Sequence, residues 1–220
     1  MSSPPPPAAQ TGLDLRQWFG EIDIYLFDQL LKGNLAPPMR VLDAGCGWGR
    51  NLPYLLRAGF DVCAIDPSAE AMEGVRALAS KWAPHLPAAN FRVEPLERLT
   101  FEDASFDAVI SSAVLHFARD EAHFRAMMHE AWRVLVPGGV FFARLASTIG
   151  IEDLVHPIDG RRYWLPDGTE RFLVDEDLIV RLTRELHGEL VEPLKTVNVQ
   201  HQRCMTTWVM TKREPAAPSR

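Results

Sequence analysis

Residues 41–51 read VLDAGCGWGRN, a short apolar run that ends in three glycines at alternate positions. Residues 52–58 then follow with the pattern of a helix. A strand that ends in glycines and leads into a helix is typical of the nucleotide-binding turn of an α/β sheet. Glycine suits this turn because a side chain would hold the ligand away from the backbone N–H groups, and because tight turns need positive φ angles. The stretch therefore predicts an α/β fold with a ligand at the end of its first strand.

The residues after this turn alternate between strand and helix patterns. We expect strands at residues 60–65, 91–94, 107–112 and 140–145, and helices at residues 51–58, 68–82 and 120–134. Such alternation predicts a parallel sheet with helices on both faces. Ligands of these sheets bind outside the carboxyl ends of the strands, where the strand order reverses, so the first strand is expected to be central.

The remaining segments are less regular. Apolar residues recur with a helical period over residues 15–31, which predicts one helix that either packs on the edge of the domain or closes over the ligand. Residues 148–173 are polar and rich in turns, and we interpret them as an insertion that is a candidate substrate lid. A helix at residues 175–187 and two strands, 191–200 and 203–211, paired as an antiparallel hairpin, complete the pattern.

Length and composition place these elements in one domain. Residues 13–213 are expected to form it, while the proline-rich leader, residues 1–12, and the tail, residues 214–220, are expected to be disordered. The formal net charge of −6 argues against a general nucleic-acid binder. Three cysteines without metal or disulfide spacing predict a reducing compartment. No apolar run approaches the roughly 18 residues of a membrane span. We expect a cytoplasmic protein with no membrane or nucleic-acid partner, present as a monomer or a homodimer.

The spacing of the glycines separates two classes of nucleotide site. A dinucleotide-binding turn reads G-x-G-x-x-G, but Arg50 stands where the third glycine would be, and the spacing is instead G-x-G-x-G, preceded by Asp43. In this form residues 41–49 resemble the first motif of the class I, Rossmann-like S-adenosylmethionine-dependent methyltransferases. Further similarities follow in the order of that family: Asp66 at the end of the second strand, residues 106–109 (FDAV), residues 135–140 (LVPGGV) and the terminal strand pair.

This resemblance implies a fold and a cofactor. The fold is a three-layer αβα Rossmann-like methyltransferase fold, with a seven-stranded, mostly parallel sheet that contains one reversed strand. The cofactor is S-adenosyl-L-methionine, and the product is S-adenosyl-L-homocysteine. The cofactor-binding residues that the resemblance implies are Asp43, Gly45, Cys46, Gly47, Arg50, Asp66, Pro67, Pro95, Leu96 and Ser111.

Two of these residues carry particular expectations, and one marks a departure from the family. An acid at the position of Asp66 accepts hydrogen bonds from the ribose hydroxyls. Asp43 is expected to fix the glycine turn through backbone N–H groups, and the resemblance implies a position near the methionine end of the cofactor; both roles can hold at once. Many relatives offer an aspartate to the adenine amino group where this chain has Pro95, so either Glu94 or the backbone N–H of Leu96 is expected to take over. Residues 50–55 and 59–62 are locally similar to the tellurite-resistance and thiopurine methyltransferase-type branch.

The acceptor site is expected beyond the fourth and fifth strands. His116 is either the general base, since its ordinary pKa lies near neutrality, or a residue that packs the loop. Phe117, Arg144, Tyr163 and Trp164 are the candidate substrate contacts: Arg144 either neutralises an acidic substrate or forms a salt bridge, and the two aromatics either cover the substrate or anchor the insertion. The acidic and histidine residues at 153, 156 and 159 suit no closed ligand set, so no metal site is expected.

The sequence thus predicts an enzyme that moves a methyl group from S-adenosylmethionine to a small-molecule acceptor by in-line displacement. Three alternatives stay open at this point. An NAD(P)-dependent Rossmann oxidoreductase shares the start of the motif but conflicts with Arg50. A non-catalytic S-adenosylmethionine-binding module would keep the glycines and lack an acceptor pocket. A nucleic-acid methyltransferase would need a basic groove, which the acidic charge balance disfavours.

Overall fold

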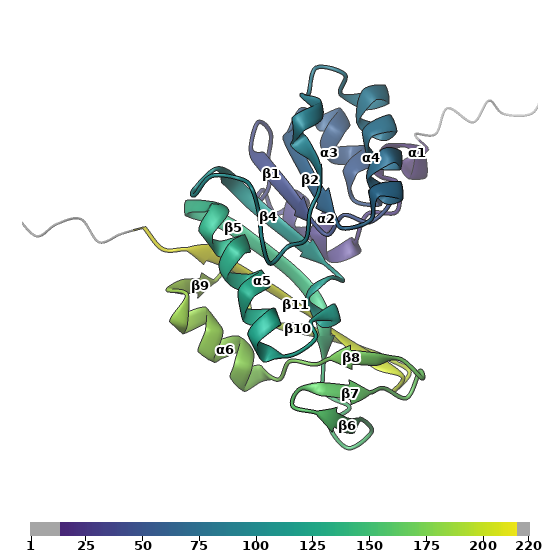
Figure 1. Ribbon diagram of the computed structural model, residues 1–220, viewed down its shortest axis with the longest axis vertical. Helices are drawn as coiled ribbons and strands as arrows, with labels where there is room; N and C mark the ends of the chain where they lie inside the picture. The colour runs from purple at the N-terminus through teal and green to yellow at the C-terminus, as the bar shows by residue number, and fades with distance from the viewer. Residues whose placement is uncertain (1–13, 215–220) are drawn as a thin grey trace, which may run out of the picture.

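The computed structural model describes residues 14–214. Within this range the main sheet has eight strands, seven of which follow one another in the order β10-β11-β5-β4-β1-β2-β3, and β9 pairs with β11 (Figure 1). Their bounds are β1 (Arg40–Ala44), β2 (Asp61–Asp66), β3 (Phe91–Val93), β4 (Phe106–Ser112), β5 (Leu135–Ser147), β9 (Gly188–Leu190), β10 (Lys195–Val199) and β11 (Arg203–Lys212).

The strand directions match the prediction. β1, β2, β3, β4 and β5 pair in parallel, whereas β11 runs antiparallel to β5, β9 and β10. β1 lies between β2 and β4, in the centre of the sheet, and the strand order reverses there. The mostly parallel sheet with one reversed strand is therefore confirmed, with the short β9 as an addition to the seven strands expected.

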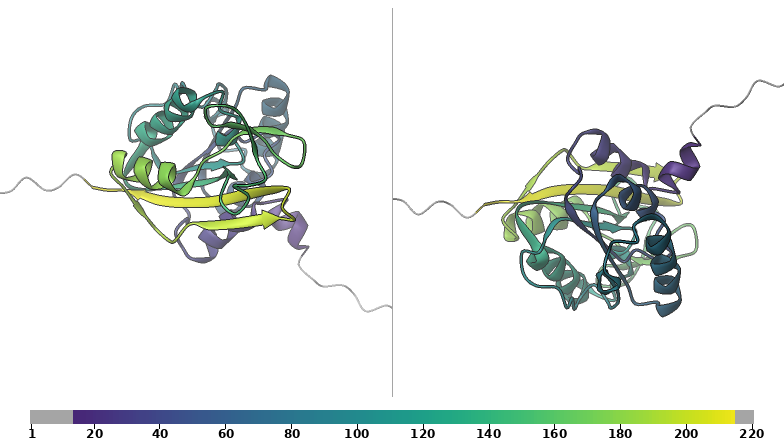
Figure 2. Two further views of the ribbon diagram at one scale, coloured as in Figure 1. Left: turned by 90° about the horizontal axis from the view of Figure 1, so that it is seen from below. Right: turned by 90° about the horizontal axis from the view of Figure 1, so that it is seen from above.

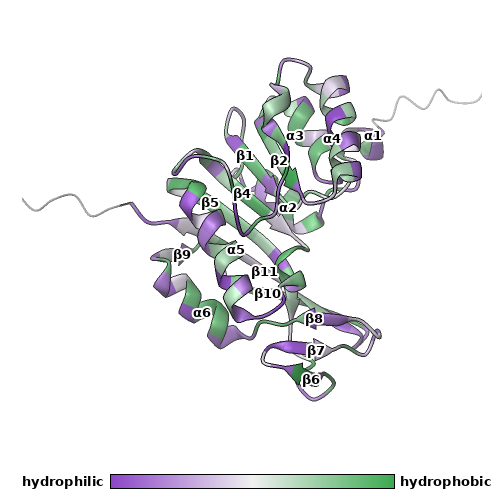
Figure 3. Cartoon of the chain, viewed as in Figure 1, coloured by the Kyte–Doolittle hydropathy of each residue, from purple (hydrophilic) through white to green (hydrophobic). Residues whose placement is uncertain are grey.

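Helices cover both faces of the sheet (Figures 1 and 2). On one face lie α5 (Glu121–Val134) and α6 (Glu176–Glu185), and on the other lie α2 (Ile24–Leu31), α3 (Leu52–Ala58) and α4 (Ala69–Trp82). Neighbouring strand residues point to opposite faces, so Leu42 packs in the core under α5 and α6 while Val41 packs in the core under the other helices. The central strands are correspondingly hydrophobic (Figure 3). The three-layer αβα architecture is confirmed.

The N-terminal segment differs from the prediction of one helix over residues 15–31. It forms α1 (Leu15–Phe19) and then α2, separated at Gly20 and Asp23. Gly20 has a φ of +63°, and a Cβ there would lie 2.7 Å from the Pro53 side chain, so the chain bends where it meets the start of α3. Asp23 then caps α2 by accepting a hydrogen bond from the backbone N–H of Tyr25. The prediction of a continuous helix was wrong because the apolar period does not reveal this bend.

Residues 148–173 contain a second, three-stranded antiparallel sheet. It consists of β6 (His156–Asp159), β7 (Arg162–Trp164) and β8 (Glu170–Phe172), so the interpretation as an irregular, turn-rich segment was incomplete. Phe172 stacks on Phe124 of α5, with ring centroids 4.8 Å apart. This contact holds the small sheet against the body of the domain, beside the end of β5 (Figure 1).

The C-terminal hairpin differs from the prediction in one detail. β10 and β11 pair antiparallel as expected, but β10 covers only residues 195–199 of the first predicted strand, residues 191–200, and the short β9 precedes it. The predicted disordered leader, residues 1–12, and all of the predicted tail except Glu214 lie outside the described residues. Among residues 14–214, no helix combines the length and the apolar character needed to span a membrane.

Candidate active site

The glycine turn after β1 has the conformation that its sequence predicts. Gly45, Gly47 and Gly49 have φ angles of +85°, +52° and +77°. The backbone N–H of Gly45 donates to the carbonyl of Ile65 at 2.9 Å, which joins the turn to the end of β2. A Cβ at Gly45 would lie 2.5 Å from Val114, whereas a Cβ at Gly47 would meet nothing within 4 Å. The turn therefore keeps open space above Gly47.

Asp66, the last residue of β2, faces this turn. Its Oδ2 accepts the backbone N–H of Gly47 at 2.9 Å, and its Oδ1 accepts the backbone N–H of Ser68 at 2.9 Å. A carboxylate has about four acceptor positions, so about two remain for a ligand. Asp66 thus both holds the turn in place and offers further acceptor capacity beside it.

A cavity of about 510 Å³ lies at this edge of the sheet, and we call it the turn cavity. It opens at the carboxyl ends of β1, β2 and β4, the position expected for a ligand of an open α/β sheet. Its volume falls in the range of small-molecule and cofactor sites. It is lined by Gly45, Gly47, Ile65, Asp66, Pro67, Glu94, Pro95, Leu96, Glu97, Ala113, Val114, Phe117, Arg119, His123 and Met127.

The loop after β3 places two carboxylates on this cavity. Glu94 is buried, and its Oε2 accepts the hydroxyl of Thr100 at 2.7 Å, so its carboxylate is already engaged. Glu97 lies 3.2 Å from Nε2 of His123 on α5. Nδ1 of His123 accepts the backbone N–H of Arg119, which leaves the proton on the nitrogen that faces Glu97. Glu97, which the sequence analysis did not select, is therefore a carboxylate at the wall of the cavity.

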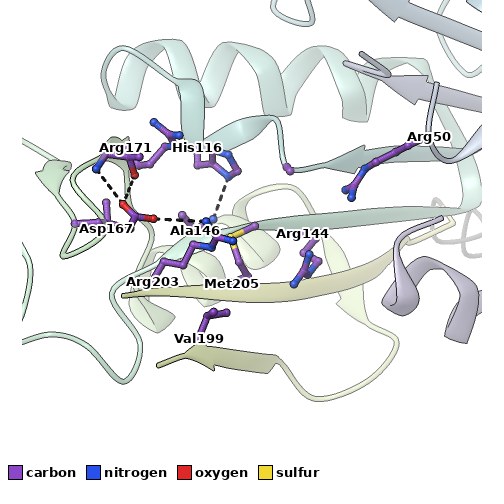
Figure 4. A pocket seen from close by; sticks show the side chains of 12 residues that line it. Arg50, His116, Arg144, Ala146, Asp167, Arg171, Val199, Arg203 and Met205 are labelled. Atoms are coloured by element: carbon purple, nitrogen blue, oxygen red, sulfur yellow. Dashed lines mark hydrogen bonds and ion pairs between the residues drawn. The ribbon is translucent and has the colours of Figure 1, made fainter. Parts of the chain in front are cut away.

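Figure 4 shows a second cavity, of about 280 Å³. We call it the arginine cavity. It is lined by Arg50, Ala113, His116, Arg144, Ala146, Leu165, Asp167, Thr169, Arg171, Val199, Arg203 and Met205. Ala113, which directly follows β4, lines both cavities. Its φ of +64° lies in the left-handed region that non-glycine residues rarely adopt, and such strain tends to occur at functional sites.

Asp23 connects the N-terminal segment to the arginine cavity. Its side chain is 1% exposed, and its Oδ2 accepts from Arg144 at 3.1 Å, from Ser112 at 3.2 Å and from Arg50 at 3.4 Å. Two guanidinium groups from β5 and from the glycine turn thus share one buried carboxylate. Nothing in the sequence pattern pointed to Asp23, which lies inside the helix predicted over residues 15–31.

His116 lies between the Arg50 end and the Arg171 end of the arginine cavity, in the short 3₁₀ turn η2 (Leu115–Phe117) (Figure 4). Its Nδ1 accepts the backbone N–H of Ala146 at 3.3 Å. Burial, together with the nearby cations Arg171, Arg144 and Arg203, lowers the pKa of His116 to about 4. The imidazole is therefore neutral near pH 7, with its proton on Nε2 and its lone pair already used. This environment favours a hydrogen-bond donor over a general base, and the catalytic role of His116 stays a prediction.

Comparison with known proteins assigns this architecture. The methyltransferase-domain family matches residues 42–143, which run from β1 through the turn to β5. The ubiquinone biosynthesis O-methyltransferase of Methylocella silvestris is 34% identical over 146 residues, which cover 64% of this chain and 54% of that protein. The matched region is therefore a methyltransferase domain, which supports a class I, Rossmann-like S-adenosylmethionine-dependent methyltransferase.

Two further comparisons show how diverse the similar proteins are. The arsenite methyltransferase of Aquipseudomonas alcaligenes is 31% identical over 153 residues, covering 60% of this chain and 43% of that protein. A 1,6-didemethyltoxoflavin-N1-methyltransferase of Burkholderia thailandensis, solved with S-adenosylhomocysteine, has a TM-score of 0.68 at 23% identity, covering 90% of this chain and 81% of that chain. The chain spans about half the length of the curated relatives it matches. Its closer similarity to the tellurite-resistance and thiopurine branch stays a prediction.

The structure brings most of the predicted site residues to the two cavities. The turn cavity takes Gly45, Gly47, Asp66, Pro67, Pro95, Leu96 and Phe117. The arginine cavity takes Arg50, His116 and Arg144, and the contact of Arg50 with the cofactor stays a prediction. Five predicted residues line neither cavity: Asp43, Cys46, Ser111, Tyr163 and Trp164.

The last five residues have physical reasons for their positions. Asp43 is buried behind the turn, and Cys46 directs its sulfur to Met72 at 3.6 Å. Ser111 is fully buried within β4. Tyr163 packs against the small core of the insertion, and Trp164 is 49% exposed. The insertion reaches the cavity through Leu165, Asp167, Thr169 and Arg171 instead.

The fold also brings to the site several residues that no sequence motif indicated. Besides Asp23 and Glu97, these are Ala113, Val114, His123, Asp167, Arg171 and Arg203. Ala113 and Val114 carried a usable signal, because they follow directly after the fourth strand. Arg171 and Arg203 carried none, because their relevance depends on how the small sheet and the C-terminal hairpin meet.

Proposed function

We propose that this chain is an enzyme that transfers the methyl group of S-adenosylmethionine to a small-molecule acceptor by in-line displacement. The observation that carries the proposal is the pair of cavities that meet at Ala113. The turn cavity has the size and position of a nucleotide site, and the arginine cavity offers a separate chamber for an acceptor. A non-catalytic module would not need the second chamber, and a dinucleotide enzyme would not have Arg50 in its glycine turn.

The residues of the turn cavity fit the cofactor of the family. The remaining acceptor positions of Asp66 suit ribose hydroxyls, and the open space above Gly47 admits a ligand against the backbone. Ile65, Leu96, Val114 and Met127 supply apolar contacts of the kind that an adenine ring needs. When bound, S-adenosylmethionine supplies an electrophilic methyl group on a sulfonium. The work of the chain is then to orient the acceptor and to exclude water.

Within this proposal, His116 positions the acceptor and does not remove a proton. Its Nε2–H is the free donor, because Nδ1 accepts from Ala146. We expect His116→Gln, which keeps an amide donor, to retain the single-turnover rate within about tenfold at pH 7, since only one hydrogen bond is altered. The single-turnover rates of the wild type and of His116→Gln should have the same pH dependence between pH 6 and 7. A decrease of the single-turnover rate by three or more orders of magnitude in His116→Gln would instead support His116 as the general base.

Calorimetry tests the first step of the proposed function. The protein is titrated with S-adenosylmethionine, with S-adenosylhomocysteine and with NAD. Binding of the first two and not of NAD is expected. Preference for NAD would refute the proposal in favour of an oxidoreductase. Release of S-adenosylhomocysteine on addition of an acceptor library would then distinguish an enzyme from a binding module.

We also propose that the insertion, residues 148–173, and the N-terminal segment close the acceptor site. The insertion contributes Asp167 and Arg171 to the cavity wall, and the N-terminal segment contributes the carboxylate of Asp23 that holds Arg50 and Arg144. Hydrogen exchange with and without S-adenosylhomocysteine tests this closure. Added protection in both segments is expected, and no change in either would contradict it.

The thiols support a reducing compartment, for which we propose the cytoplasm. Cys46, Cys63 and Cys204 are all buried and free. Cell fractionation with an antibody against the native protein tests this location, and recovery with the membrane or secreted fraction would contradict it.

A further inference from the structure

The arginine cavity carries an excess of positive charge. Four guanidinium groups line it, from Arg50, Arg144, Arg171 and Arg203, and Asp167 is the one carboxylate in its wall. Asp23 adds a second carboxylate behind the wall. This excess occurs in a chain whose formal net charge is −6, so it is a local feature and not a reflection of the composition. A cationic chamber favours an anionic ligand and disfavours an ammonium group.

The four arginines are not equally engaged. Arg50 and Arg144 share Asp23, and Arg203 lies 3.6 Å from Asp167. Arg171 has no carboxylate within 4.0 Å in the described part of the chain, and its Nη1 donates to the carbonyl of Glu170. Its guanidinium lies over the ring of Phe117, 4.9 Å from the centroid. Arg171 is therefore ordered by its neighbours while its charge stays available to a ligand.

The cavity also lacks a group suited to remove a proton. Apart from the arginines, its titratable lining residues are His116 and Asp167. The lone pair of His116 is occupied by the Ala146 N–H. Both polar groups of Thr169, its N–H and its hydroxyl, donate to Asp167, and Arg203 faces the same carboxylate. An acceptor that reacts here must bring a lone pair that needs no deprotonation.

These observations point to one class of acceptor, given that the chain is the methyltransferase proposed above. We propose that the acceptor is a small organic carboxylate, bound in the arginine cavity and methylated on its carboxylate oxygen. Arginine guanidinium groups match a carboxylate in charge and geometry. An oxygen lone pair forms the O–CH₃ bond while the S–CH₃ bond breaks and sulfur keeps its electron pair. A carboxylate and a sulfonium become a neutral ester and a thioether, and no proton moves.

This step also accounts for product release. The ester has lost the charge that the arginines attract, so methylation weakens its binding in the cavity. The four arginine side chains therefore bind the negatively charged substrate more tightly than the neutral ester product.

Binding of simple probes tests the charge preference without knowledge of the natural acceptor. Benzoate and malonate are titrated into the protein saturated with S-adenosylhomocysteine, alongside benzamide and malonamide. We expect at least one acid to bind about tenfold or more tightly than its amide, and Arg171→Gln to remove that preference. Arg181→Gln on α6 is the charge-matched control, because Arg181 lies outside both cavities and pairs with Glu185. Equal binding of acids and amides, absence of acid binding at millimolar concentration, or an unchanged preference in Arg171→Gln would overturn the proposal.

The methylated atom is tested by the product. Carboxylic acids and their amides are incubated with S-adenosylmethionine that carries a labelled methyl group. Label that mild alkali releases as methanol from the acids is the expected result, and alkali-stable label would overturn the oxygen assignment. Intact binding of S-adenosylhomocysteine without any preference for acids would refute this inference alone. Failure to bind S-adenosylhomocysteine at all would refute the proposed function.

Discussion

Substitution of Asp66 by asparagine should weaken cofactor binding far more than it weakens the fold. The two oxygens of Asp66 each accept a backbone N–H, from Gly47 and from Ser68, both at 2.9 Å. Asparagine has one acceptor oxygen, so one of these N–H groups would face an amide NH₂ instead. Because Asp66 is only half-buried, water compensates part of this loss, and we expect a cost of about 1 kcal/mol in unfolding free energy.

The effect on the cofactor is larger. The carboxylate has about two acceptor positions left, and hydrogen bonds to a charged acceptor are worth about 1.5–3 kcal/mol each, against about 0.5–1.5 for a neutral one. Asparagine keeps at most one neutral acceptor for the ribose. The net loss is about 2–3 kcal/mol, which corresponds to a roughly 30- to 150-fold higher Kd for S-adenosylhomocysteine. A stability loss near 1 kcal/mol leaves the protein folded, since domains of this size have about 5–15 kcal/mol.

Isothermal titration calorimetry with S-adenosylhomocysteine measures this Kd. Asp61→Asn is a matched control on the same strand, because Asp61 begins β2, pairs with Arg40 at 3.2 Å and lies outside the turn cavity. Its side chain is 45% exposed, so the loss of this surface pair should leave the Kd within about twofold. An unchanged Kd in Asp66→Asn, or an equal loss in both variants, would refute the assignment of Asp66 to the ribose.

Three further predictions follow from the same geometry. Gly47→Ala and Gly59→Ala both place a methyl group at positive φ with open space around it, so each should lose about 1–2 kcal/mol of stability, but only the first should weaken S-adenosylhomocysteine binding in calorimetry. Burial raises the pKa of Asp43 from 3.8 to about 7, so the stability it contributes is present below pH 4 and is lost as the pH rises through about 7. Urea unfolding should therefore show the wild type losing stability relative to Asp43→Asn over this pH interval, and parallel curves would contradict it. Asp23→Ala leaves Arg50 and Arg144 beside a buried site without a carboxylate, so it should lower the free energy of unfolding by about 3 kcal/mol, which corresponds to a Tm decrease of roughly 6–12 °C in calorimetry. Asp14→Ala, at the exposed N-cap of α1, is the control and should lower it by less than about 1 kcal/mol.

The central part of the fold was predictable because it depends on local pattern. The glycines after β1 need positive φ whatever surrounds them, and Asp66 ends a strand whose apolar period is clear in the sequence. The order of strands and helices then restricts the sheet to a few topologies, since parallel crossovers are right-handed. For these residues, local rules and the global fold agree.

The acceptor site was less predictable because it is built from long-range contacts. His116 follows the fourth strand and lines the arginine cavity, but its pKa is lowered by burial and by Arg171 and Arg203, which lie 55 and 87 positions further along the chain. Tyr163 and Trp164 stood out as aromatics, yet the register of β7 directs them to the core of the insertion and to solvent. A sequence pattern indicates which side chains are unusual, but the packing of the small sheet decides which of them reach the cavity.

Asp23 shows why the N-terminal segment belongs to the active site. Without its carboxylate, the guanidinium groups of Arg50 and Arg144 would repel each other in a partly buried space, and each would take whatever orientation best exposes it to water. With it, both are held at the wall of the arginine cavity, while Arg171 stays free of a carboxylate partner within residues 14–214. We therefore propose that the segment before the first strand acts on the acceptor through charge, by fixing two cations that a carboxylate substrate would meet. Its amphipathic pattern left open whether it packs on the edge of the domain or closes over the ligand, because the pattern of apolar residues carries no information on the partners of Asp23.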